Sequence, residues 1–111
     1  MVSKSLVAAS TKPVILSILI RGESYGYQII HRIIQLSGGT LDWSEGTIYP
    51  VLHRLEKDGF IRSQWTLAES GRRRKYYSLT PLGKKELKKE KLHWMNVNSI
   101  LSRLWAEEPG L

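Results

Sequence analysis

Residues 44–61, SEGTIYPVLHRLEKDGFI, contain a helix start, an amphipathic pattern and a helix stop within one short stretch. Ser44 is a favoured N-cap residue, and Gly59 suits a helix end because glycine readily adopts the left-handed conformation. Between them, apolar residues recur at i, i+3, i+4 and i+7, namely Ile48, Val51, Leu52 and Leu55. This spacing predicts a helix over residues 44–58 that buries a single stripe.

The opposite side of this predicted helix carries polar and aromatic side chains. It also contains Pro50, which forfeits a backbone hydrogen bond, and Tyr49, a large aromatic beside the exposed side. Core packing and a tolerated kink would explain both residues, but an exposed helix of this kind can also enter the DNA major groove and contact base edges. We therefore expect DNA contacts from Ser44, Thr47, Tyr49, Pro50, His53 and Arg54, with Lys57 on a phosphate.

The pattern changes to a period of two after Gly59. Residues 61–67 alternate apolar and polar side chains, which predicts a half-buried strand, and residues 75–79 can form the return strand of a hairpin with its tip at residues 68–74. A run of four cations lies at the tip and the start of the return strand: Arg72, Arg73, Arg74 and Lys75. A solvated loop is the plainer alternative, but arginines at a hairpin tip can reach phosphates or the narrow minor groove, so the four cations are predicted DNA contacts.

The first predicted helix covers residues 3–20 and contains a proline. Its apolar residues follow helical spacing on both sides of Pro13. Because proline lacks the N–H that an interior helical position needs, Pro13 should either kink this helix or begin a second one, with Thr11 as its cap.

A further helix is predicted over residues 25–36. Ser24 is a suitable N-cap, and the pair Gly38 and Gly39 is typical of a helix end. Tyr27 lies near its beginning, where an aromatic side chain suits core packing as well as a contact with DNA.

Thr80 and Pro81 provide the N-cap and the first residue of a long helix that reaches about Ala106. Its first part is highly charged, and its second part is rich in Leu, Ile, Val and Trp. The second part has more apolar surface than one terminal helix can hide against a small domain, so a partner chain is expected to cover it. Residues 1–80 would then form a DNA-binding domain, and residues 81–111 a dimerisation helix and tail.

The basic residues are concentrated in one part of the chain. Ten of the 17 Lys and Arg residues but only three of the ten Asp and Glu residues lie within residues 62–91, so this window carries the whole formal net charge of +7. A concentrated basic stretch is typical of proteins that bind nucleic acid or an anionic membrane surface.

Several classes of protein are excluded by the composition. The sequence has no cysteine, so it has no disulfides or thiolate metal sites, which fits a cytoplasmic protein. The longest largely apolar run, residues 14–20, is too short to span a bilayer and too close to Lys12 and Arg21 to resemble a signal peptide. The histidines lack the spacing of a helical metal pair, and neither a nucleophile with a base nor a glycine-rich phosphate loop is present. We therefore expect no metal, no cofactor, no membrane association and no enzyme activity.

Three helices followed by a basic hairpin form the order of a winged helix-turn-helix domain. Three segments also resemble the PadR family of transcriptional regulators: YGYQI (residues 25–29), SEGTIYPVLHRLEKDGFI (44–61) and GRRRKYYSLTPLGKKEL (71–87). Arg73 departs from the family pattern, which has proline there. The predicted fold is therefore mainly α with a small β-hairpin: a winged helix-turn-helix followed by a C-terminal dimerisation helix.

The resemblance implies a repressor that binds a two-fold-related operator as a homodimer and dimerises through one C-terminal helix, as in the short members of the family. Some short members bind planar, drug-like aromatic compounds in a multidrug pore at the dimer interface, and such an effector would release the DNA. Trp94 matches the stacking position there, and the matching walls are Val97, Asn98, Leu6 and Pro13. Interface packing is the plainer role for Trp94. A winged-helix adaptor that binds another protein through its apolar C-terminal helix is the alternative function.

Overall fold

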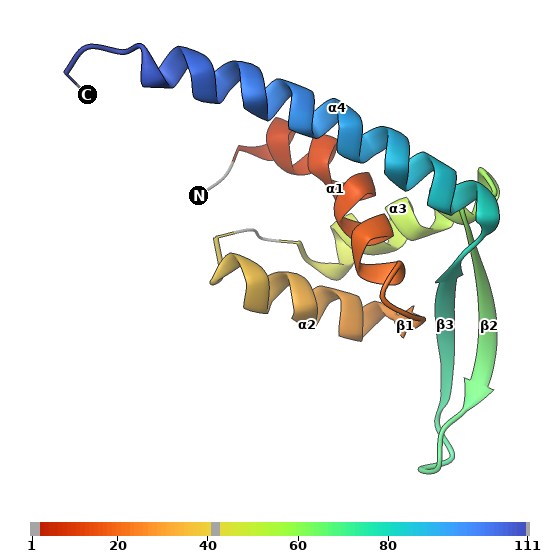
Figure 1. Cartoon of the computed structure of the whole chain (residues 1–111). Helices are drawn as coiled ribbons and strands as arrows, with labels where there is room; N and C mark the ends of the chain where they lie inside the picture. Colours follow the sequence, from red (N-terminus) through yellow and green to blue (C-terminus); the bar gives the residue numbers. More distant parts are fainter. Residues whose placement is uncertain (1–2, 41–42, 111) are drawn as a thin grey trace.

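The computed structural model describes residues 3–40 and 43–110, and within them the chain forms four helices and a three-stranded antiparallel sheet (Figure 1). In chain order the elements are α1 (Lys4–Leu19), β1 (Ser24–Tyr25), α2 (Gly26–Ser37), α3 (Glu45–Lys57), β2 (Ile61–Leu67), β3 (Arg73–Leu79) and α4 (Pro81–Ala106). The predicted fold class, mainly α with a small β-hairpin, is confirmed.

The hydrophobic core lies where α1, α2 and α3 meet the base of the sheet. The predicted stripe of α3 faces this core, with Ile48, Leu52 and Leu55 buried and Val51 half-buried. The largest fully buried side chains come from all these elements and from the loop before α3, and they include Ile15, Leu16, Ile29, Ile33, Trp43 and Ile61. Because α3 buries only one stripe, its opposite side stays open to solvent.

Helix α1 is continuous through Pro13, so of the two alternatives for this residue, a kink or a second helix, the second helix is wrong. Thr11 does not cap a helix. It is buried, and its hydroxyl donates a hydrogen bond to the carbonyl oxygen of Val7 at 2.6 Å. Burial of Thr11 on one side of the proline and of Ile15 and Leu16 on the other keeps both halves of α1 packed on the same core, which offsets the backbone hydrogen bond that Pro13 cannot make.

The strand β1 was not expected from the sequence, and it moves the start of α2 by one residue. Ser24, the predicted N-cap, lies in β1 and pairs with Tyr77 of β3, while Tyr25 takes the N-cap position. The ring of Tyr25 packs edge-on against Tyr76, with centroids 5.3 Å apart. Two residues are too few to produce an alternating pattern, so only this long-range pairing defines the strand. The predicted helix end is confirmed, since Gly38 and Gly39 both have positive φ angles.

Strands β2 and β3 form a hairpin that projects from the domain (Figure 1). The return strand begins at Arg73, two residues earlier than predicted, and the tip closes with hydrogen bonds between the backbones of Ala68, Gly71 and Arg72. The prediction that β2 is half-buried is wrong except at its base. Ile61 is 2% exposed, but Trp65 is 57% exposed because the domain does not extend beneath the outer half of the hairpin.

Helix α4 begins as predicted and ends at Ala106. The Thr80 hydroxyl accepts a hydrogen bond from the Gly83 N–H at 3.0 Å and donates one to the carbonyl oxygen of Gly59 at 2.6 Å. Only the first half of α4 packs on the domain, and the second half extends away from it (Figure 1). Its apolar side chains there are exposed: Leu92, Met95, Val97, Ile100, Leu101, Leu104 and Trp105. Within residues 3–40 and 43–110, every helix is too short or too polar to span a bilayer.

A cluster of ion pairs connects the first half of α4 to α1. The ammonium group of Lys12 contacts the carboxylate of Glu86, lies 3.5 Å from that of Glu90 and sits 4.9 Å from the centroid of the Phe60 ring. The hydrogen bond from Lys12 lowers the pKa of Glu86 below its ordinary value of 4.5, and the positive charge of Lys12 acts in the same direction.

Replacing Glu86 by Gln is expected to lower the free energy of unfolding at pH 7 by about 1 kcal/mol, as for a well-formed partly exposed pair. The folded-state pKa of Glu86 is depressed, so its contribution is present above pH 4.5 and disappears as the pH falls through the lower folded-state value. Urea unfolding at pH 7 and pH 3 measures the difference. Glu69→Gln, at the exposed hairpin tip, is the matched control; equal losses in both variants would contradict the assignment.

Candidate nucleic-acid interface

The open side of α3 presents most of the residues predicted to contact DNA. Thr47 is half-buried and the others are exposed: Ser44, Tyr49, Pro50, His53, Arg54 and Lys57. Ser44 occupies the N-cap position of α3, but its side chain makes no capping hydrogen bond. The hydroxyl of Ser44 can therefore bond to another partner.

Tyr49 lies between α3 and the first turn of α2. A Cβ atom added to Gly26 would come within 2.4 Å of the Tyr49 hydroxyl oxygen, so the glycine makes room for this ring. Tyr49 is 37% exposed, and its partial burial, followed by the charge of Glu45, raises the pKa of its hydroxyl. Tyr49 thus packs the two helices together, and a third of its surface remains available on the open side of α3.

The hydroxyl group of Tyr27, near the beginning of α2, lies beside Glu45 at the beginning of α3. A hydrogen bond and the negative charge of Glu45 raise the pKa of the Tyr27 hydroxyl, while the nearby cation of Arg72 acts in the opposite direction. Tyr27 comes from α2 and Glu45 from α3, and both are exposed, so the beginnings of these two helices share an exposed surface. Glu45 was missed in the sequence, where an acid in the first turn of a helix indicates only a favourable dipole contact.

The four cations of the hairpin have different surroundings. Arg72 and Arg73 are exposed, and the Arg73 guanidinium lies 5.4 Å from the Trp65 ring. Arg74 points to the other side of the hairpin, 4.5 Å from the ring of Tyr25. Lys75 shares the side of Arg73 and is half-buried. The aromatic rings hold two of the guanidinium groups in place, whereas Arg72 has no such ring beside it within the described residues.

Glu56 fastens the end of α3 to both strands of the hairpin. Its carboxylate accepts a hydrogen bond of 2.5 Å from the Ser63 hydroxyl of β2 and lies 3.7 Å from the Lys75 ammonium of β3. Because this carboxylate offsets part of its charge, we expect Lys75 to be the weakest of the four predicted contacts with DNA. Glu56 itself was missed because nothing in the sequence pairs it with residues 63 and 75. Its two contacts join the end of α3 to β2 and β3.

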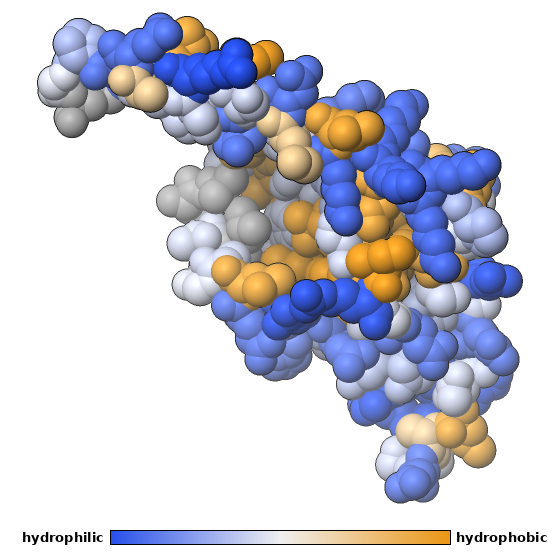
Figure 2. Space-filling model, viewed as in Figure 1, coloured by the Kyte–Doolittle hydropathy of each residue, from blue (hydrophilic) through white to orange (hydrophobic). Residues whose placement is uncertain are grey.

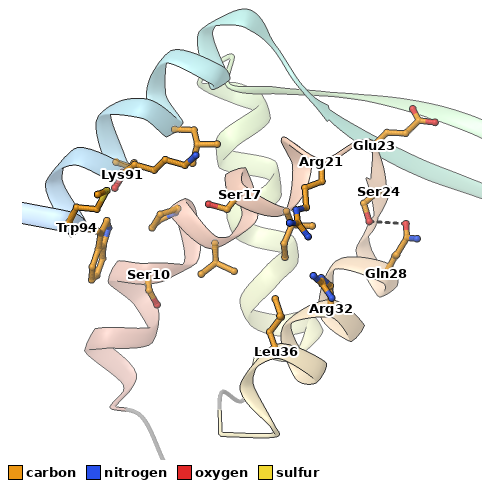
Figure 3. Close-up of a pocket in the computed structure, with 17 residues that line it drawn as sticks. Ser10, Ser17, Arg21, Glu23, Ser24, Gln28, Arg32, Leu36, Lys91 and Trp94 are labelled. Carbon is orange, nitrogen blue, oxygen red and sulfur yellow. Dashed lines mark hydrogen bonds between the residues drawn. The ribbon is translucent and has the colours of Figure 1, made fainter. Parts of the chain in front are cut away.

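A groove of about 820 Å³ opens on a different part of the domain, between α1, α2 and α4. Figure 2 shows apolar surface gathered in this hollow, bordered by hydrophilic residues. Of the residues predicted to hold an aromatic effector, Pro13 and Trp94 line the groove, and Trp94 closes its α4 end (Figure 3). The other three lie outside it and are exposed: Leu6, Val97 and Asn98.

The described residues hold no group of three His, Asp or Glu side chains with the geometry of a metal site. The ionisable groups of the interface are instead dispersed over α3 and the hairpin. This surface consists of an open helix face, which carries hydroxyl, imidazole and guanidinium groups, and of a projecting hairpin with arginines. Such groups suit hydrogen bonds to base edges and charge-assisted bonds to phosphates.

Comparisons with known proteins identify several relatives. The sequence model of the Transcriptional regulator PadR-like family matches residues 15–89. A protein of Lysinibacillus sphaericus named uncharacterized protein X is 31% identical over 101 residues, covering 91% of this chain and 93% of that protein. The fold is similar to that of a PadR-like transcriptional regulator from Bacillus cereus, with a TM-score of 0.84 and 28% identity, covering 95% of this chain and 100% of that chain.

The PadR protein of Bacillus subtilis matches in sequence and in structure. It is named a negative transcriptional regulator and is 36% identical over 76 residues, covering 68% of this chain and 42% of that protein. Its crystal structure in complex with operator DNA matches with a TM-score of 0.64 and 35% identity, covering 70% of this chain and 44% of that chain. The chain therefore spans less than half the length of this relative.

Proposed function

Since the chain belongs to the PadR-like family of transcriptional regulators, we propose that it is a sequence-specific DNA-binding repressor that acts as a homodimer. The family consists of regulators and not of enzymes. The B. subtilis relative is named a negative regulator and was crystallised with operator DNA, which supports both DNA binding and repression. The chain would act in the cytoplasm.

The observation that favours DNA most strongly is the open side of α3 together with the projecting hairpin, which carries the exposed Arg72 and Arg73. In the proposed complex α3 lies in the major groove, where Thr47 and His53 face base edges. Arg54 and Lys57 then lie closer to the backbone. The hairpin acts as the wing, and its arginines contact phosphates or the minor groove. Glu56 would fix the angle between these two contacts.

The exposed second half of α4 supports the homodimer. Two copies related by a two-fold axis would cover each other's apolar residues and place two copies of α3 on successive major grooves. An adaptor that binds an unrelated protein through α4 is the second candidate, favoured by the same exposed residues. Sedimentation analysis separates them, because a homodimer is expected for the repressor and a monomer for the adaptor.

A gel-shift titration with the DNA upstream of the chain's own gene tests the proposed function. We expect tighter binding to this DNA than to a scrambled sequence of equal length, because α3 distinguishes base edges. The logarithm of the affinity should fall with the logarithm of salt concentration by roughly 0.9 for each phosphate contacted. Equal affinity for the two DNA molecules would exclude a specific repressor.

The proposal includes a small aromatic or drug-like effector that releases the repressor from DNA. Trp94 and Pro13 at the groove support it, because an indole ring can stack on a planar compound. A planar aromatic dye such as ethidium should quench the tryptophan fluorescence, and Trp94→Ala should abolish most of the quenching with little change in DNA affinity. Trp65→Phe on the wing is the matched control. Unchanged quenching in Trp94→Ala would refute the effector site.

A further inference from the structure

The groove between α1, α2 and α4 contains two arginines without a carboxylate partner in the described part of the chain. Arg21, which follows α1, and Arg32 of α2 point toward one another across the groove (Figure 3). Glu90 at its edge is already paired with Lys12, and Glu23 extends away from the interior. The groove is therefore apolar along its walls and positively charged at the end where α1 and α2 meet.

The far end of α4 has the complementary composition. Its last turns expose Leu101, Leu104 and Trp105, and the two acids Glu107 and Glu108 follow directly. Neither acid forms an ion pair within residues 3–40 and 43–110. An apolar helix that ends in two carboxylates matches an apolar groove that ends in two guanidinium groups.

Two-fold symmetry brings these two parts together. In a symmetric dimer a residue i that contacts j in the partner implies that j contacts i. The exposed apolar stretch of α4 runs from residue 92 to 105. An antiparallel pair that covers this stretch fully would cross near residues 98 and 99. Residues 107 and 108 of one copy then lie beside residues 89 to 91 of the other. That position is the α4 edge of the groove, from which the carboxylates of residues 107 and 108 would face Arg21 and Arg32 across the groove.

We propose that the end of α4 from a second copy of this chain docks in the groove and that its Glu107 and Glu108 pair with Arg21 and Arg32. This inference rests on the proposed homodimer and specifies how its two halves are joined. Arg21 lies just before β1, and Arg32 lies on α2, the helix that begins with Tyr27 at the DNA-facing surface. The contact thus connects the dimer helix to the DNA-binding part of the partner. It sets the separation of the two copies of α3, and with it the spacing of the half-sites.

Charge reversal on each side provides the test, with dimer dissociation measured by sedimentation equilibrium. A groove variant, Arg21→Glu with Arg32→Glu, and a tail variant, Glu107→Lys with Glu108→Lys, each place like charges together at both contacts of a homodimer. Each variant alone is expected to dimerise on the order of 100-fold more weakly than the wild type, because like-charge contacts at an interface are costly. Mixing the two variants is expected to restore dimers of nearly wild-type affinity, since both contacts of the mixed dimer join opposite charges.

The outcomes separate this contact from the homodimer itself. The ion pairs are wrong, but the homodimer stands, if the wild type dimerises and both variants dimerise with the same affinity as the wild type. The same conclusion follows if the mixed dimer is no more stable than the dimer of either variant alone. A monomeric wild type overturns both. If the groove variant does not fold, the tail variant still decides the question. Its substitutions are exposed, and it should dimerise weakly at low salt and approach the wild type as salt screens the repulsion.

Discussion

Replacing Arg72, Arg73 and Arg74 together by alanine is expected to lower the affinity for operator DNA by about 100-fold near physiological salt, because each arginine that no longer neutralises a phosphate no longer releases a counterion. The salt dependence should become shallower by up to roughly 2.7 in slope, or 0.9 for each phosphate. Arg72 should account for the largest single effect, because Arg73 and Arg74 also contact aromatic rings of the protein. Gel-shift titrations at several salt concentrations measure both quantities.

The matched control removes the same charge elsewhere. Lys84, Lys85 and Lys88 on α4 are exposed, and their replacement by alanine changes the net charge by the same amount. If the wing acts through local phosphate contacts, the lysine variant keeps most of its affinity and its salt slope. Equal losses in both variants would mean that net charge alone drives binding. The wing variant should also lose affinity for operator and scrambled DNA in parallel, whereas Thr47→Ala or His53→Ala should lower mainly the preference for the operator.

The second large effect is expected at Gly83, where Gly83→Ala should lower the free energy of unfolding by about 3 kcal/mol or more, at the upper end of overpacking substitutions. A Cβ atom there would meet the carbonyl oxygen of Phe60 at 1.9 Å and its carbonyl carbon at 2.9 Å. These are backbone atoms in a buried position, so α4 would have to shift away from the start of the wing. Urea unfolding measures the loss.

Gly46→Ala is the matched control for Gly83→Ala. Gly46 lies in the first turn of α3, and a Cβ atom there would meet only the Ser44 hydroxyl oxygen, at an ordinary 3.7 Å. Alanine is the better helix former by about 1 kcal/mol, so Gly46→Ala should be neutral or stabilising. Equal stability of the two variants would contradict the close approach of α4 to Phe60.

The sequence predicted those parts of the fold that depend on local pattern. The apolar spacing of α3, the glycines after α2 and the Thr80–Pro81 start of α4 are visible within a few residues of each element, and all three are confirmed. The alternative of a second helix beginning at Pro13 is wrong for the opposite reason. Core packing on both sides of a proline outweighs its local cost, and that packing comes from residues distant in sequence.

The missed features of the site all join residues that lie far apart in the chain. Glu56 contacts positions 63 and 75, and the Tyr49 ring lies against Gly26. Arg21 and Arg32 face each other only because α1 and α2 enclose the same groove. Residue types could identify the cations of the wing. Only the folded structure shows which of them lie beside a carboxylate or an aromatic ring and which do not.

Hydroxyl-radical footprinting on the DNA upstream of the chain's own gene would show whether the chain binds there as a dimeric sequence-specific regulator. We expect two protected half-sites related by a two-fold axis, with centres about 10 base pairs apart or a multiple of that spacing, because each copy of α3 enters one major groove. Protection that is spread evenly along the DNA, or confined to a single half-site, would contradict a dimeric sequence-specific regulator.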